Sequence, residues 1–310
     1  MKKEMTFKEL SVLWIEEKRQ FVKRSTISTY SVTLEKHINP HFGDYTTVIT
    51  EEDIQTFVLD KISAGLKLKS VKDILVVIKM VYRYGVKCGV MENTMWDIKF
   101  PTSQNQRQQI EVLSITNEKR LIGYLNNNFS FRNLGILLCL HTGMRIGEIC
   151  ALTWNDIDIE QGLIHVRKTL ERIYTTDNHK RRTEIVISNA KTVCSVREIP
   201  ISSNLLKILK PLKKIVAGTF YVLSNDDKPL EPRTYRNYYK SVLTKLDIPM
   251  LKFHGLRHSF ATRCIENNCD YKTVSVLLGH STINTTLNLY VHPDNNQKKR
   301  CIEKMLKAIK

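Results

Sequence analysis

Seven side chains from residue 145 onward are of types that could act together on a phosphate ester. Arginine offers a planar fork of N–H donors to phosphate oxygens and stays charged at any working pH. A tyrosine hydroxyl can attack phosphorus, but its ordinary pKa of about 10 makes it a weak nucleophile unless cations stabilise the developing charge. Histidine and lysine can move a proton, and a carboxylate can orient an arginine. The candidates are Arg145, Glu148, Lys191, His254, Arg257, His280 and Tyr290.

The spacing of these residues favours some roles over others. His254 and Arg257 are three apart, so on a helix both project to one side. His254 and His258 are four apart, as in a zinc pair, but no glutamate stands beside the first histidine as in HExxH, and Arg257 brings a positive charge to the same face. We therefore expect no metal, and we expect His258 to pack or to hydrogen-bond to another residue of the site.

Arg145 and Tyr290 each also have a simpler interpretation. Arg145 could form a surface ion pair with Glu148, three residues on. Tyr290 is one of twelve tyrosines, and most buried tyrosines simply pack with a satisfied hydroxyl. Its position distinguishes it, because it lies ten residues after His280 and near the end of the last predicted helix before the tail.

The first hundred residues should form a small bundle of about four helices. Three residue pairs have the capping-box pattern that starts a helix: Thr6 with Glu9, Thr50 with Asp53, and Ser70 with Asp73. A further helix should cover residues 26–38 and end before Pro40, and Gly65 and Gly85 stand where the third and fourth helices should stop.

A polar stretch without periodicity, Pro101 to Gln109, separates this bundle from the rest. We predict a helical domain at 1–105, a linker at 106–112 and a second domain at 113–310. The second domain begins with helical patterns, then alternates in GLIHVRKTL, RRTEIVIS and VREIPIS, and returns to helical spacing after residue 202. The expected fold is mainly α with one small antiparallel sheet, so the second domain is α+β.

Composition and charge indicate a folded protein with a polyanionic partner. Residues 1–105 carry 16 basic and 13 acidic side chains, whereas residues 106–310 carry 32 and 18, so most of the net charge of +17 lies in the second domain. Neutralising phosphates is the usual use of such charge, although a basic surface can also be merely solubilising. The seven scattered cysteines include no CxxC pair, and they suggest reduced thiols. No signal peptide or membrane-length apolar run is present, so we expect the protein in the cytosol.

Five short segments of the second domain together resemble the active-site motifs of tyrosine recombinases, the phage integrase family. The segments are TGMRIGE, AKTVCSVREIP, HGLRH, LGH and TLNLY, in that family's order and approximate spacing. The helical first domain resembles the family's SAM-like core-binding domain. The resemblance implies an enzyme that cleaves and rejoins duplex DNA at a specific site, without metal or ATP. Consistently, the chain has no GxxxxGK[ST] phosphate loop, and we expect no cofactor.

The resemblance also implies roles for the matching residues. Tyr290 would be the nucleophile and form a 3′-phosphotyrosine, while Arg145 and Arg257 would bind the phosphate oxygens. His254 would act as acid or base and His280 would donate a hydrogen bond. Glu148 would orient the cluster, and Lys191, on a predicted hairpin turn, would protonate the leaving 5′ oxygen. The family often has proline just before this lysine, whereas Asn189 and Ala190 stand here; a plain phosphate contact is the alternative for Lys191.

Two further segments concern partners. A basic hairpin could follow the DNA backbone, or be only a solvated ribbon; its cations are Arg167, Lys168, Arg172, Lys180 and Arg181.

The tail after Tyr290 is amphipathic. Its apolar residues are Cys301, Ile302, Met305, Leu306 and Ile309. In the family such a tail packs on a neighbouring subunit of a tetramer on DNA, and accessory proteins can take part; docking within the same chain is the alternative.

Two other classes of function explain part of these patterns. A helical DNA-binding regulator without chemistry accounts for the charge and the bundle, but it gives no reason for Arg145, Lys191, Arg257 and Tyr290 to occur together. A type IB topoisomerase shares the tyrosine chemistry but would act as a monomer without choosing a site.

Overall fold

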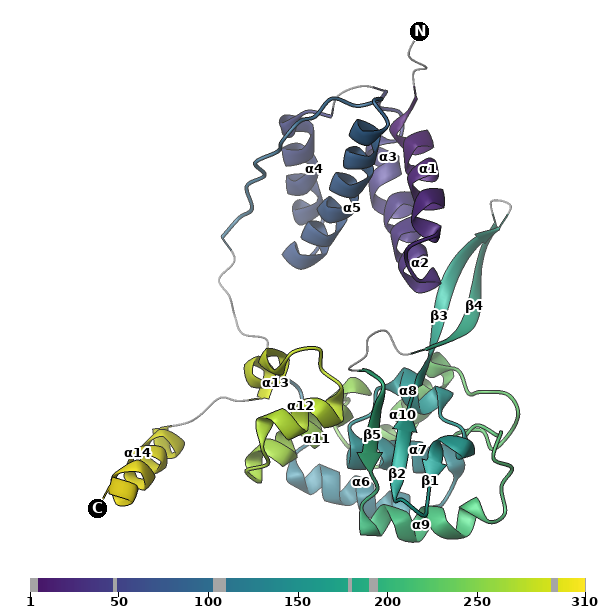
Figure 1. The fold of residues 1–310 in the computed structure, drawn as a ribbon, viewed down its shortest axis with the longest axis vertical. Coiled ribbons are helices and arrows are strands. Elements are labelled where there is room, and N and C mark those ends of the chain that lie inside the picture. The colour runs from purple at the N-terminus through teal and green to yellow at the C-terminus, as the bar shows by residue number, and fades with distance from the viewer. Residues whose placement is uncertain are drawn as a thin grey trace. The chain divides into compact units, whose positions relative to one another are not determined.

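The computed structural model describes residues 5–46, 49–102, 110–177, 180–189, 195–290 and 295–309. The chain divides into two compact units (Figure 1). The first contains residues Met1–Arg107 with the segment Ile173–Glu184, and the second contains Gln108–Arg172 with Ile185–Lys310. Each unit has its own apolar core.

The first unit is helical, and two of its helices start as the sequence predicts. Its helices are α1 (Phe7–Arg19), α2 (Arg24–Thr33), α3 (Asn39–Phe42), α4 (Glu51–Ser63) and α5 (Leu68–Lys87). Before α1 the backbone N–H of Glu9 donates to Thr6 Oγ1 at 3.2 Å, and the Glu9 carboxylate accepts from the Thr6 N–H at 2.9 Å. Thr50 and Asp53 form the same capping box before α4. Both predicted boxes are thus confirmed.

Two other predictions for this unit are wrong. The segment Ser70–Asp73 does not start a helix, because α5 begins at Leu68 after an extended Lys67, which places Ser70 inside the first turn. The second helix does not end before Pro40: α2 continues through a π-helical turn, Leu34–Ile38, into α3. Pro40 is the second residue of α3, where proline is tolerated because its ring already fixes a helical φ.

The predicted glycine stops are half correct. Gly65 has a left-handed φ of +85° just after α4, as is common at helix ends. Helix α5, in contrast, passes through Gly85 and ends at Lys87, two residues before the left-handed Gly89. Gly85 is needed for packing, since a Cβ there would come within 2.7 Å of the side chains of Leu10 and Met91.

The second unit combines helices with a three-stranded antiparallel sheet and part of a β-hairpin, whose segment Ile173–Glu184 belongs to the first unit. This confirms the expected fold class. Its first helices are α6 (Ile115–Asn127), α7 (Phe131–Thr142) and α8 (Ile146–Ala151), and its later ones are α9 (Ser203–Lys213), α10 (Pro232–Lys245), α11 (His254–Glu266), α12 (Tyr271–Leu278), α13 (Ile283–Tyr290) and α14 (Asn295–Ile309). Helix α7 is apolar on nearly all sides and lies in the core, where α11 packs against it.

The strands fall into two sheets instead of the single sheet that the sequence suggested. One sheet has the order β1-β2-β5, formed by Ile157–Asp158, Leu163–Val166 and Arg197–Pro200. In it, Ile164 pairs with Ile199 and Val166 with Arg197. The other is the hairpin of β3 (Lys168–Asp177) and β4 (Lys180–Asn189).

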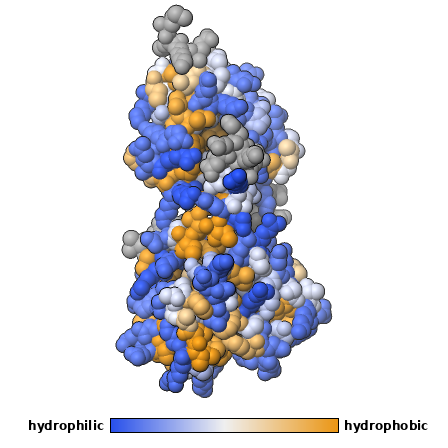
Figure 2. Space-filling model, turned by 90° about the vertical axis from the view of Figure 1, so that its right-hand side faces the viewer, coloured by the Kyte–Doolittle hydropathy of each residue, from blue (hydrophilic) through white to orange (hydrophobic). Residues whose placement is uncertain are grey.

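On the face shown in Figure 2, hydrophilic residues predominate and hydrophobic ones gather in separate patches. Among the residues that the structure describes, no helix has both the length and the apolar character needed to cross a bilayer.

Candidate active site

Arg145 lies at the N-terminal end of α8, where the chain reverses after α7. Gly143 makes this reversal possible, because it adopts the left-handed φ of +64° directly after α7. The Arg145 backbone N–H donates to Glu148 Oε2 at 2.8 Å, and its Nη1 donates to Glu148 Oε1 at 2.8 Å. The simple ion pair with Glu148 is therefore present. It does not exclude a role in phosphate binding, since the Arg145 side chain remains partly open to solvent.

Arg257 is buried on α11, with 1% of its surface exposed. Its Nη1 donates to the carbonyl oxygen of Gly143 at 2.8 Å, and its Nη2 donates to that of Leu278 at 2.7 Å. Burial, and then the nearby positive charge of Arg145, lower the pKa of Arg257 to about 9. The guanidinium is still charged at neutral pH, so the second unit contains a buried cation that can bind an anion.

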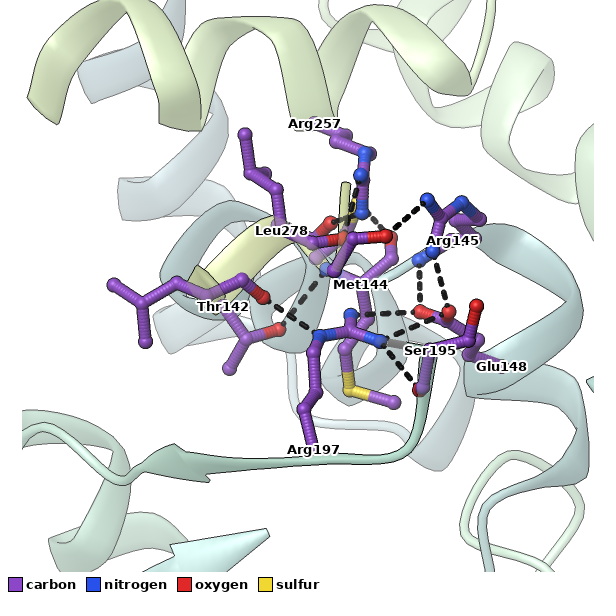
Figure 3. A network of polar contacts seen from close by, with 12 residues as sticks. Thr142, Met144, Arg145, Glu148, Ser195, Arg197, Arg257 and Leu278 are labelled. Carbon is purple, nitrogen blue, oxygen red and sulfur yellow. Dashed lines mark hydrogen bonds and ion pairs between the residues drawn. The ribbon is translucent and has the colours of Figure 1, made fainter. Parts of the chain in front are cut away.

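Arg197, on β5, completes the cluster, and sequence reasoning missed it. Its Nη1 and Nη2 donate to the two carboxylate oxygens of Glu148 at 3.0 and 2.9 Å (Figure 3). Both side chains are buried, at 3% and 5% exposure. Burial favours a higher pKa for Glu148, but the hydrogen bonds and charge of Arg197, together with Arg145, outweigh it and lower that pKa. Glu148 is therefore a carboxylate that holds two arginines, as expected of an orienting residue.

A signal for Arg197 was present in its strand. Residues of β5 alternate between buried and exposed, and Arg197 shares the buried side with Ile199. A cation on the apolar side of a strand needs a buried partner of opposite charge.

The C-terminal end of α12 holds three guanidinium groups through backbone atoms. The carbonyl oxygens of Leu277, Leu278 and Gly279 accept from Arg197, Arg257 and Arg145 respectively, at 2.7, 2.7 and 3.0 Å. The last carbonyls of a helix lack intrahelical partners and form the negative end of its dipole. We call these three oxygens the α12 carbonyl trio; they position the three cations relative to one another.

His254 and His280 are uncharged at neutral pH. Although the His254 ring reaches solvent, burial within the site, followed by the charges of His258, Arg257 and Arg145, lowers its pKa to about 4. Burial, then Arg257 and Arg145, likewise lower the pKa of His280 to about 4. The Nδ1 of His280 lies 2.8 Å from the Oγ1 of the buried Thr286, which fixes the ring. Neutral imidazoles can donate one hydrogen bond and accept another.

Tyr290 ends α13 and lies against α11. Its hydroxyl oxygen is 2.6 Å from Nδ1 of His258, and 9% of the residue is exposed. Burial raises the pKa of Tyr290, while the charges of Arg257 and Arg145 oppose that rise. The His258 ring also meets His254 edge to face, with centroids 4.6 Å apart. The hydrogen bond expected of His258 is therefore present.

The structure thus gathers six of the predicted residues: Arg145, Glu148, His254, Arg257, His280 and Tyr290. Lys191 lies outside the described residues. The flanking strands β4 and β5 belong to different sheets, so they do not form with each other the hairpin that the sequence suggested.

The predicted DNA-contacting cations differ in their surroundings. Arg167 and Lys168 are exposed at the start of β3. Arg172 forms an ion pair with Glu231, with its Nε 2.5 Å from Oε1. Lys180 and Arg181 are part of β4, but their side chains lie outside the described residues.

A zinc site is not supported by the geometry. Within the described ranges, no group of three or more histidine, cysteine, aspartate or glutamate residues is placed to hold a metal ion. One nitrogen of the His254–His258 pair is also already engaged with Tyr290.

Comparisons with known proteins identify the family. The model of the phage integrase family matches residues 111–297, and that of the phage integrase N-terminal SAM-like domain matches residues 6–62. A tyrosine recombinase XerC-like protein of Caldanaerobacter subterraneus subsp. tengcongensis is 28% identical over 283 residues, covering 84% of this chain and 72% of the relative. The ICEBs1 integrase of Bacillus subtilis is 26% identical over 290 residues, covering 86% and 75%.

A solved structure shares the fold. The Tn1549 transposon integrase, in complex with transposon right end DNA, superimposes with a TM-score of 0.79 at 21% identity, covering 97% of this chain and 100% of that chain. The chain therefore belongs to the phage integrase family, the tyrosine recombinases, and is a site-specific recombinase.

Proposed function

We propose that this recombinase cuts and rejoins duplex DNA through a covalent bond to Tyr290. The Tyr290 oxygen attacks a phosphodiester, the bond from phosphorus to the 5′ oxygen breaks, and a 3′-phosphotyrosine and a free 5′ hydroxyl result. The hydroxyl of a second DNA end then attacks the phosphotyrosine and restores both the DNA bond and the tyrosine. The linkage conserves the bond energy, so no ATP is needed.

The observation that carries this proposal is the place of the Tyr290 hydroxyl. Tyr290 is mostly buried, and the positive charges of Arg257 and Arg145 both favour a lower pKa of its hydroxyl. During attack the nonbridging oxygens of the phosphate gain negative charge, and donors already aimed at that position stabilise it. The α12 carbonyl trio holds both arginines in place before DNA arrives.

The remaining roles follow from the same chemistry. Glu148 orients Arg145, His280 donates a hydrogen bond to the phosphate, and His254 acts as acid or base there. Lys191 protonates the departing 5′ oxygen, because an alkoxide is a poor leaving group. In our proposal no metal or cofactor takes part.

The partner is duplex DNA carrying a target site. We assign residues 1–105 to core-type DNA binding and residues 113–310 to catalysis, joined by the linker at 106–112. Five cations contact the DNA backbone: Arg167, Lys168, Arg172, Lys180 and Arg181. The first two of them are exposed. The integrases named above suggest a mobile element as the setting, and a DNA substrate implies a cytoplasmic location.

Four protomers would assemble on two sites, with α14 packing on a neighbouring subunit. The apolar residues of α14 support this assignment, since Ile302, Met305, Leu306 and Ile309 are all exposed. Accessory proteins could join such an assembly.

The direct test is capture of the covalent adduct. A target duplex nicked near the cleavage position loses a short fragment after cutting, so the adduct accumulates and is seen on a denaturing gel. We expect Tyr290→Phe to bind this DNA with unchanged affinity and to form no adduct. An adduct in that variant would move the nucleophile elsewhere.

Tyr239→Phe is a matched control for the loss of a hydroxyl. Tyr239 is buried in the core of the same unit, and its hydroxyl has no hydrogen-bond partner among the described residues. We expect this variant to form the adduct at the wild-type rate.

A further inference from the structure

The Tyr290 hydroxyl and His258 form a short contact between two helices of the site. Nδ1 of His258, on α11, lies 2.6 Å from Oη of Tyr290, at the end of α13, and the ring centroids are 5.6 Å apart. Among the described residues, this imidazole is the hydrogen-bond partner of that hydroxyl. The distance is within the range over which a proton passes from a nucleophile to a base.

We propose that His258 accepts the Tyr290 proton as the tyrosine oxygen attacks phosphorus, and returns it when the phosphotyrosine is broken. This inference rests on the proposed function, in which Tyr290 is the nucleophile. In the forward step the bond from Oη to phosphorus forms, the Oη proton moves to Nδ1, and the bond from phosphorus to the 5′ oxygen breaks. In the reverse step Nδ1 gives the proton back to Oη, so the cycle leaves no net change on His258.

The tautomer of His258 is defined by this role. Nδ1 accepts from the hydroxyl only if the ring proton is on Nε2. His254 meets this ring edge to face, whereas the hydrogen bond to Tyr290 belongs to His258. Of the two histidines, His258 is therefore the better placed acceptor.

The charges around His258 suit a base that gives its proton back. His254 and Arg257 neighbour it on α11, Tyr290 faces it from α13, and Arg145 acts on the same hydroxyl from the start of α8. Burial, followed by Arg257, lowers the pKa of His258, so its ring is neutral at pH 7 and free to accept. Once protonated, the ring stands beside a guanidinium, and this repulsion favours return of the proton.

His258→Asn separates proton acceptance from positioning. The Oδ1 of asparagine occupies nearly the place of Nδ1 and still accepts a hydrogen bond, but an amide oxygen is not a useful base. We expect the single-turnover cleavage rate of the nicked duplex to fall about 10²-fold at pH 7, with DNA affinity unchanged. A rate within about threefold of wild type would overturn the proposal, because positioning alone would then suffice.

The dependence on pH gives a second readout that needs no variant. With His258 as acceptor, the wild-type cleavage rate is level above about pH 7 and falls only in acid, as the ring takes up a proton. In His258→Asn the rate should instead keep rising towards pH 9, because the attacking species must be the phenolate. A wild-type rate that rises about tenfold per pH unit between pH 7 and pH 9 would contradict the proposal.

A substrate with sulfur in place of the bridging 5′ oxygen shows which end of the reaction His258 serves. A thiolate leaves without being protonated, so this substrate should restore cleavage to a variant that lacks the acid, such as Lys191→Ala. It should not restore His258→Asn, whose defect concerns the attacking oxygen. Restoration of His258→Asn would place the residue on the leaving group and overturn the inference.

Two controls keep the outcomes distinct. His141→Gln removes a histidine of the same unit that contacts Ser202 at 3.0 Å, and should leave cleavage unchanged. If Tyr290→Phe still forms the adduct, the proposed function itself fails. If Tyr290→Phe forms none while His258→Asn is normal, only the inference about His258 fails. Should His258→Asn not fold, His258→Gln and the wild-type pH profile decide the question.

Discussion

Glu148 is the residue on which the arrangement of the cations depends most directly. Its carboxylate binds the guanidinium of Arg197 with both oxygens and the guanidinium of Arg145 with one, in a place where it is almost fully buried. A buried carboxylate is tolerable only when cations and hydrogen-bond donors surround it. Removing one arginine leaves the negative charge of Glu148 without full compensation. The cluster can therefore be tested by measuring the free energy of unfolding.

We expect Arg197→Met to lower the free energy of unfolding by about 3 kcal/mol, because it leaves Glu148 buried with Arg145 as its remaining ion-pair partner. Chemical denaturation monitored by circular dichroism measures this change. Arg172→Met is the matched control, since its ion pair with Glu231 is more exposed and should contribute less than about 1 kcal/mol. Equal losses in the two variants would mean that burial does not distinguish the pairs.

The neutral histidines make stability depend on pH. In the unfolded chain a histidine has a pKa of about 6.5, whereas His254 and His280 have pKa values of about 4 when folded. Below pH 6.5 the unfolded chain therefore binds protons that the folded chain does not, so stability is full above pH 6.5 and decreases as the pH falls towards 4.

The melting temperature should accordingly drop between pH 7.5 and pH 5.5, measured by differential scanning calorimetry. His280→Gln should show a smaller drop over the same interval, although its melting temperature at pH 7.5 is lower because the Thr286 contact changes. An identical drop in variant and wild type would show that His280 does not contribute.

Sequence reasoning found the residues whose chemistry is distinctive, and missed those defined by their partners. Arg145, Arg257 and Tyr290 occur in motifs that can be read from neighbouring letters. Arg197 matters because Glu148, forty-nine positions earlier, folds against it, and no local pattern contains that fact. The sequence predicted a hydrogen bond or a packing role for His258, but only the structure shows that its partner is Tyr290 of α13.

At the scale of elements, local signals predicted helix starts well where only nearby atoms are involved. The capping boxes at Thr6 and Thr50 are closed by residues three positions on. The prediction that Gly85 stops a helix was wrong, because glycine is needed there to leave room for Leu10, a residue of another helix. The division of the strands into two sheets was also beyond the sequence, since alternation identifies a strand but not its neighbour.

A substitution at Gly143 shows how much the site depends on the turn after α7. Its φ is left-handed, a Cβ there would lie 2.6 Å from Phe260 and 2.8 Å from Leu278, and its carbonyl oxygen binds Arg257. We expect Gly143→Ala to reduce stability by about 2 kcal/mol or more and to slow DNA cleavage. Urea denaturation and the adduct assay measure the two effects.

Gly123→Ala is the matched control. Gly123 lies inside α6, and a Cβ there would meet nothing within 4 Å. This variant should be more stable by roughly 0.5–1 kcal/mol, since alanine favours a helix interior. A loss of stability here comparable to that of Gly143→Ala would contradict our account of the turn.

At the scale of the whole molecule, the uneven charge predicts how binding responds to salt. The segment 106–310 has 32 basic and 18 acidic side chains, so DNA binding should release many counterions. We expect the logarithm of the binding constant to fall linearly with the logarithm of salt concentration, as measured by fluorescence anisotropy. A flat response would count against a DNA partner.

The role of individual cations can be separated from that of overall charge. Arg167→Ala with Lys168→Ala should reduce the steepness of the salt dependence by about 0.9 for each phosphate that the protein no longer neutralises. Lys207→Ala with Lys210→Ala removes the same charge from exposed positions on α9. If the two double variants behave alike, the start of β3 has no special part in binding DNA.

The α12 carbonyl trio has a consequence for how the enzyme tolerates change. Backbone oxygens survive every amino-acid replacement, so solvent-facing positions of α12 can vary freely during evolution without disturbing the guanidiniums. Any shift of the helix terminus, in contrast, would alter one contact of Arg145, Arg197 and Arg257 at the same time. Phosphate binding should therefore weaken through all of these cations together, and not through one cation at a time.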